Sequence, residues 1–366
     1  GDVILAATKK LYLDGGTHTY LSEKSADVVV LNCGGVETRL ADITAANNTV
    51  FGVAAGDSIT SGTKNVTIGG SAGTAISYGV QHTAVGYQAL MSIATTHYST
   101  AVGYQALNPD TGGSNAAVGH SAGLANIGGV QNVYMGFQAG LQNETGDKCT
   151  AIGSEAMYTN SASDGLTAIG FESLRVATGT LNTAVGYQAG DGITSGTTNT
   201  MIGASTACDV DANNQSCLGY GATTDSANDI AIGNTSVDEV KGQVDFTTFS
   251  DKRIKRNIED GDLGLEFINL LKPKKFNKVN PAKYPKSIKK PNDGITGTWT
   301  KKQAEKVWDG LIAQDVKDAM DKCDTTYSGW SEESNSKQAI TYSTLVVPLI
   351  KAVQELTARL EKLEGK

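Results

Sequence analysis

One pattern of hydrophobic and polar residues recurs along the chain from Thr49 to Ser236. The octapeptide TAVGYQAL occurs at residues 83–90 and again at 100–107, and TAVGYQAG follows at 183–190. Aligned on a shared glycine, twelve units are separated by steps of 17 or 16 residues and a last step of 14. Such a regular repeat predicts a stack of coils in which each coil contacts only its neighbours. The aligned glycines are Gly52, Gly69, Gly86, Gly103, Gly119, Gly136, Gly153, Gly170, Gly186, Gly203, Gly219 and Gly233.

Each unit opens with a short alternating segment, typified by Thr-Ala-Val-Gly, that predicts a β-strand. The last apolar residue before the glycine should stack with its counterparts into one ladder along the fibre interior. The glycine indicates a bend or a close backbone approach, and a small residue three positions later marks a second crowded position. The ladder residues are Val85, Val102, Ile152, Ile169, Val185 and Ile202. The small residues are Ala89, Ala106, Ala122, Ala139, Ala156, Ser173 and Ala189.

A unit of 16–17 residues can hold two short strands and two turns, which make one coil of a parallel β-roll. Stacked at about 4.8 Å, twelve coils would form a rod about 55 Å long. Segments rich in Gly, Asn, Thr and Ser separate the strands as turns. Because the turns of a shaft face outward, Asn108–Ser114 and Asp191–Thr197 are candidate receptor contacts.

These units resemble the coils in the left-handed β-roll heads of trimeric autotransporter adhesins, over about Thr49–Ser236. The repeat is a few residues longer here than in that family. The resemblance implies three rolls packed side by side around a threefold axis. The predicted fold class is therefore mainly β, a trimeric fibre of parallel β-roll or β-solenoid repeats of about 17 residues. An α+β domain that ends in a short trimeric coiled coil follows the repeats.

The segments on either side of the repeats have different patterns. Residues 1–48 contain three alternating strands, with a DGG turn between the first two, and predict a small β cap or knob. Residues 237–249 predict a linker strand. Within residues 250–366, Asp262–Leu271 has helical spacing, and Ala304–Met320 predicts a strand followed by a helix.

The last element, from about Leu345 to the end, predicts a helix with a coiled-coil seam. Its apolar residues are spaced alternately by four and three, as at the a and d positions of heptads. Pro348 suits the first turn of a helix. Two heptads are marginal in isolation, so the rest of the domain should support the helix. The seam residues are Leu349, Val353, Leu356, Leu360 and Leu363.

Charge changes sign at residue 250, which predicts a domain boundary there. Residues 1–249 hold 8 Lys and Arg against 21 Asp and Glu, whereas residues 250–366 hold 22 against 17. With 43 glycines and only 6% aromatic residues, the chain suits stacked backbone better than a conventional core. Five scattered cysteines without a CxxC pair predict reduced thiols, with no disulfide framework and no zinc site. No metal or cofactor is expected, and no apolar run is long enough for a transmembrane helix.

Three motifs in residues 250–366 resemble the endosialidase-type C-terminal chaperone, the peptidase S74 family. They are SDKRIKRNI from Ser250, GLIAQD from Gly310, and YSTLVVPLIKAVQEL from Tyr342. The resemblance assigns the chaperone motif to Asp251, Arg253, Asn257, Gly310, Gln314 and Asp315. Asp315 stands where that family usually has Glu, and the Lys-rich loop Asn277–Lys306 is longer than usual. The resemblance predicts an intramolecular chaperone over residues 250–366, after a β cap at 1–48, a shaft at 49–236 and a linker at 237–249.

The same resemblance implies a catalytic Ser–Lys dyad, Ser250 with Lys255, that cuts the chain once and has no external substrate. A serine hydroxyl needs a nearby base, and a lysine serves as that base when burial or neighbouring cations favour its neutral form. The neighbouring cations are Lys252, Arg253 and Arg256. Reactivity favours cleavage between Phe249 and Ser250, and cleavage after Ser250 stays open. A chaperone fold with an inactive dyad, or a plain solvated turn at SDKR, are the other interpretations.

The combined interpretation is a bacteriophage tail fibre, a receptor-binding virion protein made in the host cytoplasm. Its expected partners are two further copies of itself, other tail proteins, and a host receptor that is a glycan or an outer-membrane protein. The Lys-rich loop is interrupted by Pro, Gly and Asn, so neither nucleic-acid binding nor membrane insertion is expected. Two alternatives stay open, a trimeric surface adhesin and a polysaccharide-degrading tailspike. A tailspike needs paired carboxylates, and the few shaft acids are not expected to recur at equivalent repeat positions.

Overall fold

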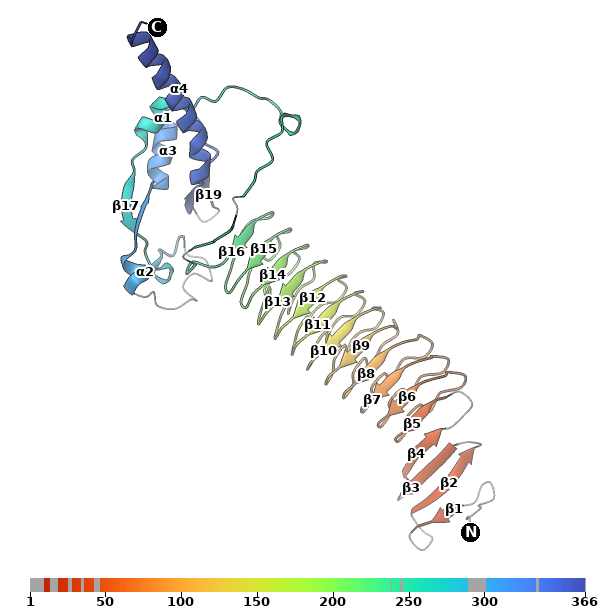
Figure 1. Ribbon diagram of the computed structural model, residues 1–366. Helices are drawn as coiled ribbons and strands as arrows, with labels where there is room; N and C mark the ends of the chain where they lie inside the picture. The colour runs from red at the N-terminus through yellow and green to blue at the C-terminus, as the bar shows by residue number, and fades with distance from the viewer. Residues whose placement is uncertain are drawn as a thin grey trace. The chain divides into compact units, whose positions relative to one another are not determined.

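The computed structural model describes residues 10–13, 19–25, 28–33, 36–42, 47–237, 239–243, 246–288, 301–333 and 336–365. The chain divides into two compact units, Gly1–Asn234 and Thr235–Lys366 (Figure 1). The boundary between the units lies two residues before the predicted end of the shaft. The finer domain borders at residues 48 and 249 stay predictions.

Twelve strands of three residues each form one parallel sheet in strict chain order, which confirms the β-solenoid (Figure 1). Equivalent residues of successive coils pair directly, as Thr83 pairs with Thr100 and Val85 with Val102. Each coil therefore repeats the position of the coil before it. The strands are β5 (Thr49–Phe51), β6 (Val66–Ile68), β7 (Thr83–Val85), β8 (Thr100–Val102), β9 (Ala116–Val118), β10 (Val133–Met135), β11 (Thr150–Ile152), β12 (Thr167–Ile169), β13 (Thr183–Val185), β14 (Thr200–Ile202), β15 (Ser216–Leu218) and β16 (Ile230–Ile232).

The middle residue of each strand fills the interior of its coil. Small residues such as Ala84, Ala101 and Ala184 are completely buried there, and so is the second crowded position three residues after the glycine. The predicted ladder of Val and Ile residues does stack in register. It lies on the outer face of the coil, however, where Val185 is 37% and Ile202 42% exposed. Side chains alternate between the two faces of a strand, so the middle residue points inward and the residues on either side of it point outward. The inward position is mostly alanine, and it also holds the completely buried Tyr134 and Met201.

Each coil contains one assigned strand, so the expectation of two strands per coil is wrong. The opposite side of the coil is a series of turns that include left-handed residues, such as Gln88 at φ 55° and Leu90 at φ 47°. The next coil repeats them at Gln105 and Leu107. A left-handed residue interrupts β geometry, so in the described residues the pairing outside the named strands is limited to an isolated parallel bridge between Ala207 and Thr223.

The repeated glycine is required by a close approach between neighbouring coils. Gly103 has φ +142°, and a Cβ atom placed on it would lie 2.2 Å from the carbonyl oxygen of Gly119. Neither the backbone conformation nor the space admits a side chain. The predicted bend and close approach at this glycine are therefore confirmed.

A ladder of buried side-chain amides, interrupted at a few coils, joins successive coils of the solenoid, and the sequence pattern did not predict it. Asn132 Oδ1 accepts a hydrogen bond from the Cys149 N–H at 2.8 Å, while its Nδ2 donates to the Gly146 carbonyl at 2.8 Å. Both partners belong to the following coil. Buried backbone groups must be paired, so this ladder replaces strand pairing at the turns. The same two bonds are made by Asn48, Asn65, Asn115, Asn132, Asn182 and Asn199.

His82 takes the place of asparagine in one step of this ladder. Its Nδ1 accepts from the Ser99 N–H at 3.2 Å, and its Nε2 lies 2.7 Å from the Thr96 carbonyl oxygen, to which it donates. Only the neutral ring with its proton on Nε2 can make both bonds. Burial lowers the pKa of His82, which agrees with that neutral form.

Asp110 completes the ladder at Ser99, whose single hydroxyl accepts from the Asn115 N–H of the next coil at 3.4 Å but lacks the second polar atom of an amide. Asp110 Oδ2 accepts from the Ser99 hydroxyl at 3.1 Å, and Oδ1 accepts from Asn115 Nδ2 at 3.0 Å and Asn126 Nδ2 at 2.9 Å. Asp110 is completely buried. The prediction that the turn Asn108–Ser114 faces outward is therefore wrong for this residue. The candidate turn Asp191–Thr197 remains a prediction.

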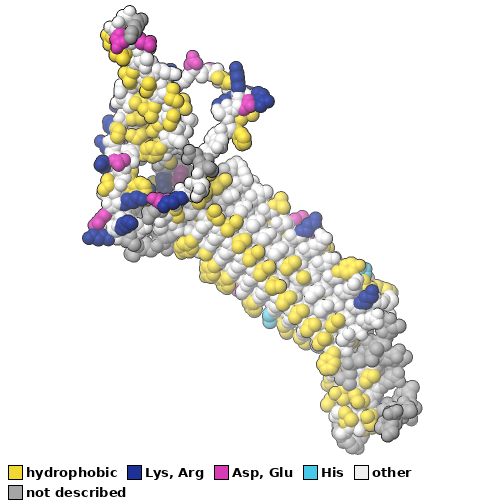
Figure 2. Space-filling model, viewed as in Figure 1, with side chains coloured by type: hydrophobic (Ala, Val, Ile, Leu, Met, Phe, Trp, Pro, Cys, Tyr) yellow, Lys and Arg dark blue, Asp and Glu magenta, His cyan; other side chains and the backbone are white. Residues whose placement is uncertain are grey.

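The outer face of the sheet carries a continuous apolar stripe. We call the outward-facing third residues of β5–β16, together with the rings that follow the repeated glycines, the outer stripe. Tyr87 stacks on Tyr104 at a centroid distance of 5.5 Å, and Tyr104 on His120 at 4.8 Å. Figure 2 shows hydrophobic side chains recurring in rows along the face of the solenoid in view. In the single chain, the solenoid therefore exposes a row of large apolar side chains along one face.

Before the solenoid, four antiparallel strands form a separate sheet in the order β1–β2–β3–β4. The prediction was three strands, and its DGG turn lies outside the described residues. The described residues therefore contain one strand more than the sequence predicted. The strands are β1 (Lys10–Tyr12), β2 (Thr19–Ser25), β3 (Val28–Cys33) and β4 (Val36–Asp42).

The second unit is a mixed α/β region built around a small core of Phe267, Val316, Ala319, Met320 and Tyr327. The predicted helix, strand–helix pair and final helix are all present, whereas the described residues of 237–249 contain no strand. In the described part of the chain, no helix is long and apolar enough to cross a membrane. The elements are η1 (Lys252–Ile254), α1 (Leu265–Leu270), β17 (Lys274–Asn277), η2 (Pro281–Lys283), α2 (Lys301–Glu305), β18 (Val307–Gly310), α3 (Ala313–Lys322), β19 (Trp330–Glu332), β20 (Gln338–Ile340), η3 (Tyr342–Leu345) and α4 (Val346–Leu363).

Replacing Asn132 by alanine should destabilise the solenoid by about 2–4 kcal/mol, because two buried backbone groups lose their partners at once. Urea denaturation monitored by circular dichroism measures the change. The matched control is Gln142→Ala, at an exposed amide in the following turn, which should change stability by less than about 0.5 kcal/mol. Equal effects of the two substitutions would contradict a stabilising amide ladder.

Replacing His82 by asparagine should remove part of the acid sensitivity of the solenoid. Because the pKa of His82 is lowered on folding, stability is complete above pH of about 6.5 and declines as pH falls from there toward the folded-state pKa. The unfolded chain binds the proton first in that window, at a cost of up to about 1.4 kcal/mol per pH unit. Asparagine keeps both ladder bonds and does not titrate. Urea midpoints at pH 7.5 and pH 5 should therefore differ less in His82→Asn, and the account fails if that variant and the unaltered chain lose stability equally.

Candidate functional site

One short turn brings the predicted dyad together. Lys255 Nζ donates a hydrogen bond to Ser250 Oγ at 2.6 Å. The turn between them is η1, which begins after Asp251, whose carboxylate accepts from the Arg253 N–H at 2.8 Å. The Lys255 N–H donates to the Lys252 carbonyl and closes the turn. The five-residue spacing thus places an amine on a hydroxyl through local structure alone.

The cations around the dyad differ in how they are paired. Arg253 Nη2 lies 2.6 Å from Asp251 Oδ2, and this ion pair lowers the pKa of Asp251. The positive charge of Arg253 is therefore largely offset by its own neighbour. Within the described residues, no ion pair involves Lys252 or Arg256. These two side chains supply the uncompensated positive charge close to Lys255.

The dyad lies entirely in solvent in the single chain. Every residue from 249 to 260 is exposed, and Phe249, the residue before the expected cut, is 89% exposed. A lysine becomes an effective base when it is removed from water or crowded by cations. In the single chain, Ser250 and Lys255 are thus in contact but remain fully open to water.

The remaining motif residues have structural positions away from the dyad. Gly310 ends β18, and a Cβ atom there would lie 2.5 Å from Tyr342 Oη, which accepts from the Leu311 N–H at 2.8 Å. The second motif thus packs directly on the third. Asp315 lies in the first turn of α3, where a negative charge is favourable. Among the described residues, no hydrogen bond or ion pair joins Gln314 or Asp315 to the dyad, and Asn257 is an exposed turn residue at φ 51°.

Several residues that organise this unit were not predicted. Tyr327 is buried, and its hydroxyl donates to the Thr341 carbonyl at 3.0 Å and lies 2.6 Å from Thr344 Oγ1. Glu355 on α4 accepts from the Leu265 N–H at 2.9 Å and so caps the start of α1. Tyr342 belongs to a motif that the sequence analysis quoted, which could have indicated its role. The pairing of Glu355 with Leu265, 90 residues apart, leaves no local signal.

The predicted seam residues lie on an exposed side of α4. Leu349, Val353, Leu356, Leu360 and Leu363 are each at least 47% exposed. The helix is held by the buried residues Pro348 and Ala352, so the seam itself contacts no core. Leucines at this spacing on an open helix face are typical of a helix that packs on other helices.

The acids of the solenoid were expected not to recur at equivalent positions of the repeat, and this is wrong for Glu155 with Glu172, Asp147 with Asp164, and Asp209 with Asp225. Glu155 and Glu172 occupy the same position in successive coils, and Arg175 contacts both, at 3.3 Å and 3.8 Å. Burial and the nearby charge of Glu172 raise the pKa of Asp191. Arg175 forms ion pairs with both carboxylates. Two carboxylates that share one arginine do not favour the tailspike alternative, which needs a pair of catalytic acids.

Among the described residues, the cysteines and the potential metal ligands do not form a second candidate functional site. All five cysteines are free, and burial raises the pKa of Cys149 to about 11 and that of Cys208 to about 12. Thiols with raised pKa values are poor nucleophiles and poor metal ligands. Among the residues that the structure describes, no three His, Cys, Asp or Glu side chains gather in a way that could hold a metal ion.

A comparison with protein families supports the predicted resemblance. The family model Peptidase_S74, chaperone of endosialidase, matches residues 250–325. Searches of the curated proteins and of the solved structures each returned no match. The family match begins at Ser250, the residue that Lys255 contacts, and runs through α3. The chain thus has a Peptidase S74 chaperone-of-endosialidase domain near its C-terminus, preceded by a β-solenoid of about 17 residues per turn, a combination typical of phage tail fibres.

Proposed function

We propose that this protein is the shaft of a phage tail fibre that carries its own assembly factor and releases it by self-cleavage. The observation that carries the proposal is the contact of 2.6 Å between Lys255 Nζ and Ser250 Oγ, at the residue where the family match begins. That position directly follows the solenoid unit and its short connection. A cut there would separate a complete solenoid from a complete chaperone region.

The proposed reaction is an acyl shift followed by hydrolysis. Lys255 takes the proton from Ser250 Oγ, which attacks the carbonyl carbon of Phe249. The bond between that carbon and the Ser250 nitrogen breaks, the proton passes to this nitrogen, and an ester to Oγ remains. Water then cleaves the ester and leaves a carboxylate on Phe249 and a free amine on Ser250. No cofactor is needed for these steps.

The proposed assembly is a trimer of parallel chains. The outer stripe of the solenoid and the seam of α4 are two separate apolar surfaces that additional copies would cover. The outer stripe repeats in every coil, so two solenoids that slip by one coil still present similar chemistry to each other. A helical trimer at one end would select a single register before the shafts pair. Domains of this family typically mediate trimerisation, which supports this order of events.

The proposed setting is the virion. A fibre of this kind would join other tail proteins at one end and contact a host-surface glycan or outer-membrane protein through its exposed turns. Asp191–Thr197 is such a turn, because several of its residues are exposed. The adhesin alternative shares the trimeric shaft, and no observation favours it over the fibre.

Self-cleavage can be tested on the full chain by denaturing gel electrophoresis. The unaltered chain should give two fragments of about two-thirds and one-third of its length, because residue 250 lies at that point. Ser250→Ala should abolish the cut, and Lys255→Met should slow it at least about 100-fold, as expected for loss of a general base. Mass spectrometry of the smaller fragment identifies which side of Ser250 is cut.

Lys252→Met is the matched control, since it removes one cation from the same turn but leaves the Ser250–Lys255 contact and Arg256. It should still cleave, more slowly than the unaltered chain and clearly faster than Lys255→Met. A single full-length band from the unaltered chain would contradict self-cleavage. Equal loss of cleavage in Lys252→Met and Lys255→Met would show that general charge, rather than the contact with Ser250, matters.

A further inference from the structure

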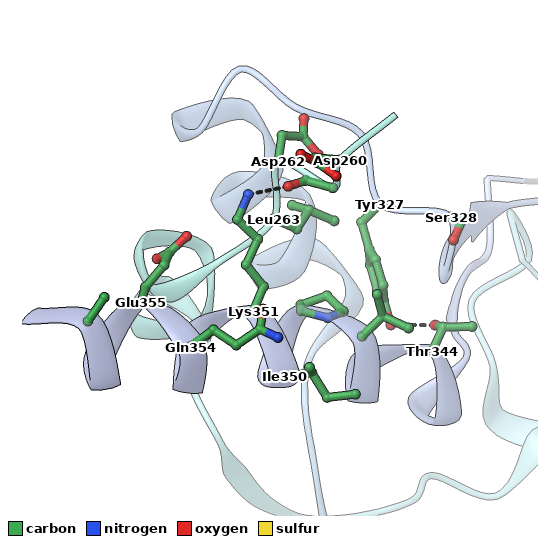
Figure 3. Close-up of a pocket in the computed structure, with 14 residues that line it drawn as sticks. Asp260, Asp262, Leu263, Tyr327, Ser328, Thr344, Ile350, Lys351, Gln354 and Glu355 are labelled. Atoms are coloured by element: carbon green, nitrogen blue, oxygen red, sulfur yellow. Dashed lines mark hydrogen bonds between the residues drawn. The ribbon is translucent and has the colours of Figure 1, made fainter. Parts of the chain in front are cut away.

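A groove runs along α4 in the second unit. It has a volume of about 790 Å³ and lies between α4 and the segment that precedes α1 (Figure 3). Its apolar lining includes Leu263, Tyr327, Val347 and Ile350. Val347 and Ile350 are 69% and 53% exposed, so the chain itself leaves much of this apolar surface open.

The groove has an acidic rim. Asp260, Asp262 and Glu355 contribute three carboxylates to the lining, and Lys351 is the one cation there. Lys351 Nζ donates to the Gly261 carbonyl, which fixes the edge of the groove, as the dashed line in Figure 3 shows. The groove therefore suits an occupant that combines apolar side chains with positive charge.

The segment Ser250–Ile258, which we call the arm, has this composition. Ile254 and Ile258 are 67% and 59% exposed, although both are large aliphatic residues. Four cations, Lys252, Arg253, Lys255 and Arg256, stand against one carboxylate in the arm. Among the described residues, the hydrogen bonds and ion pairs of the arm side chains stay within the arm. The arm is thus an exposed apolar and basic segment, and the groove is an open apolar and acidic one.

We propose that the arm of one copy lies in the groove of a second copy, with Ile254 and Ile258 against Val347 and Ile350 and the cations Lys252 and Arg256 along the acidic rim. This inference rests on the proposed function only in requiring that copies associate. The arm of the same chain does not fill this groove, because no arm residue lines it and, among the described residues, the bonds of the arm side chains stay within the arm. The seam of α4 lies beside the groove on the same helix, so a copy packed on the seam brings its arm close to it.

The proposed contact is heterologous, because each copy gives an arm and receives a different one. A head-to-tail contact of this kind forms a closed ring when the rotation between copies completes a circle. Three copies around the seam of α4 would close such a ring, with every groove filled. The arm therefore would add a contact that the seam alone does not provide.

Cysteine cross-linking between distinguishable copies tests the contact. Two full-length chains are co-expressed, both with Ser250→Ala so that neither chain is cut, and one carries an additional tag that changes its size. The tagged chain carries Ile254→Cys and the other carries Ile350→Cys. Mild oxidation should give a mixed tagged–untagged disulfide at least about tenfold more abundantly than in the control, because docking raises the local concentration of the two thiols. If these variants fail to fold, Ile258→Cys with Val347→Cys replaces them.

The matched control pairs Ile254→Cys with Asp309→Cys, an exposed position outside the groove. Chains with one new cysteine each reveal any disulfides made by the native cysteines. A cross-link no stronger than in the control, or one that forms only when both cysteines are in the same chain, overturns the proposal. If light scattering still reports a trimer and the unaltered chain still cuts itself, the proposed function survives that result. A monomer that does not cleave would instead contradict the proposed function.

Discussion

The structure depends on one constraint: the buried polar groups and the backbone of each coil must fit and hydrogen-bond to the coil that follows it. The Asn132 amide, the close approach at Gly103 and the three-residue strands all join residues about 17 positions apart. Stability in such a solenoid is a sum of contacts between neighbouring coils, and every coil presents a similar outer surface. A shaft of this kind can be stable as a stack and still carry little information about how it should align with another shaft.

The second unit has the opposite character. Its core is small, its longest helix exposes the seam from Leu349 to Leu363, and its Ser250–Lys255 pair lies in solvent. In the proposed trimer, neighbouring copies would cover the exposed seam and the exposed Ser250–Lys255 pair. In the proposed scheme, the unit fixes the alignment that the repeats cannot fix, and its removal leaves the shaft without the means to reassemble. Kinetic rather than equilibrium stability would then preserve the fibre.

The sequence predicted the parts of the fold that repeat without interruption. The glycine at Gly103 and the alanine at Ala106 recur at nearly every coil, so their roles could be predicted from spacing alone. The amide ladder was not predicted because the asparagines do not recur in every coil: His82, Ser99, Cys149 and Leu166 stand at the equivalent positions. At Ser99, the ladder is completed by Asp110, which comes from a turn. The prediction of a second strand in each coil was wrong because the left-handed residues that interrupt it, such as Gln88, are not glycines and carry no obvious turn signal in the sequence. The spacing of Ser250 and Lys255 predicted their contact, whereas the surface that would cover them cannot be inferred from one chain.

The most direct test of this account is the dependence of refolding on residues 250–366. The full chain with Ser250→Ala and the isolated residues 1–249 are each unfolded in guanidinium chloride and diluted, and light scattering measures recovery of the native assembly. The account predicts that the full chain regains its trimeric state and that the shorter chain yields monomers or aggregates. Equal recovery of trimers from the two chains would contradict the claim that the C-terminal unit sets the alignment of the shaft.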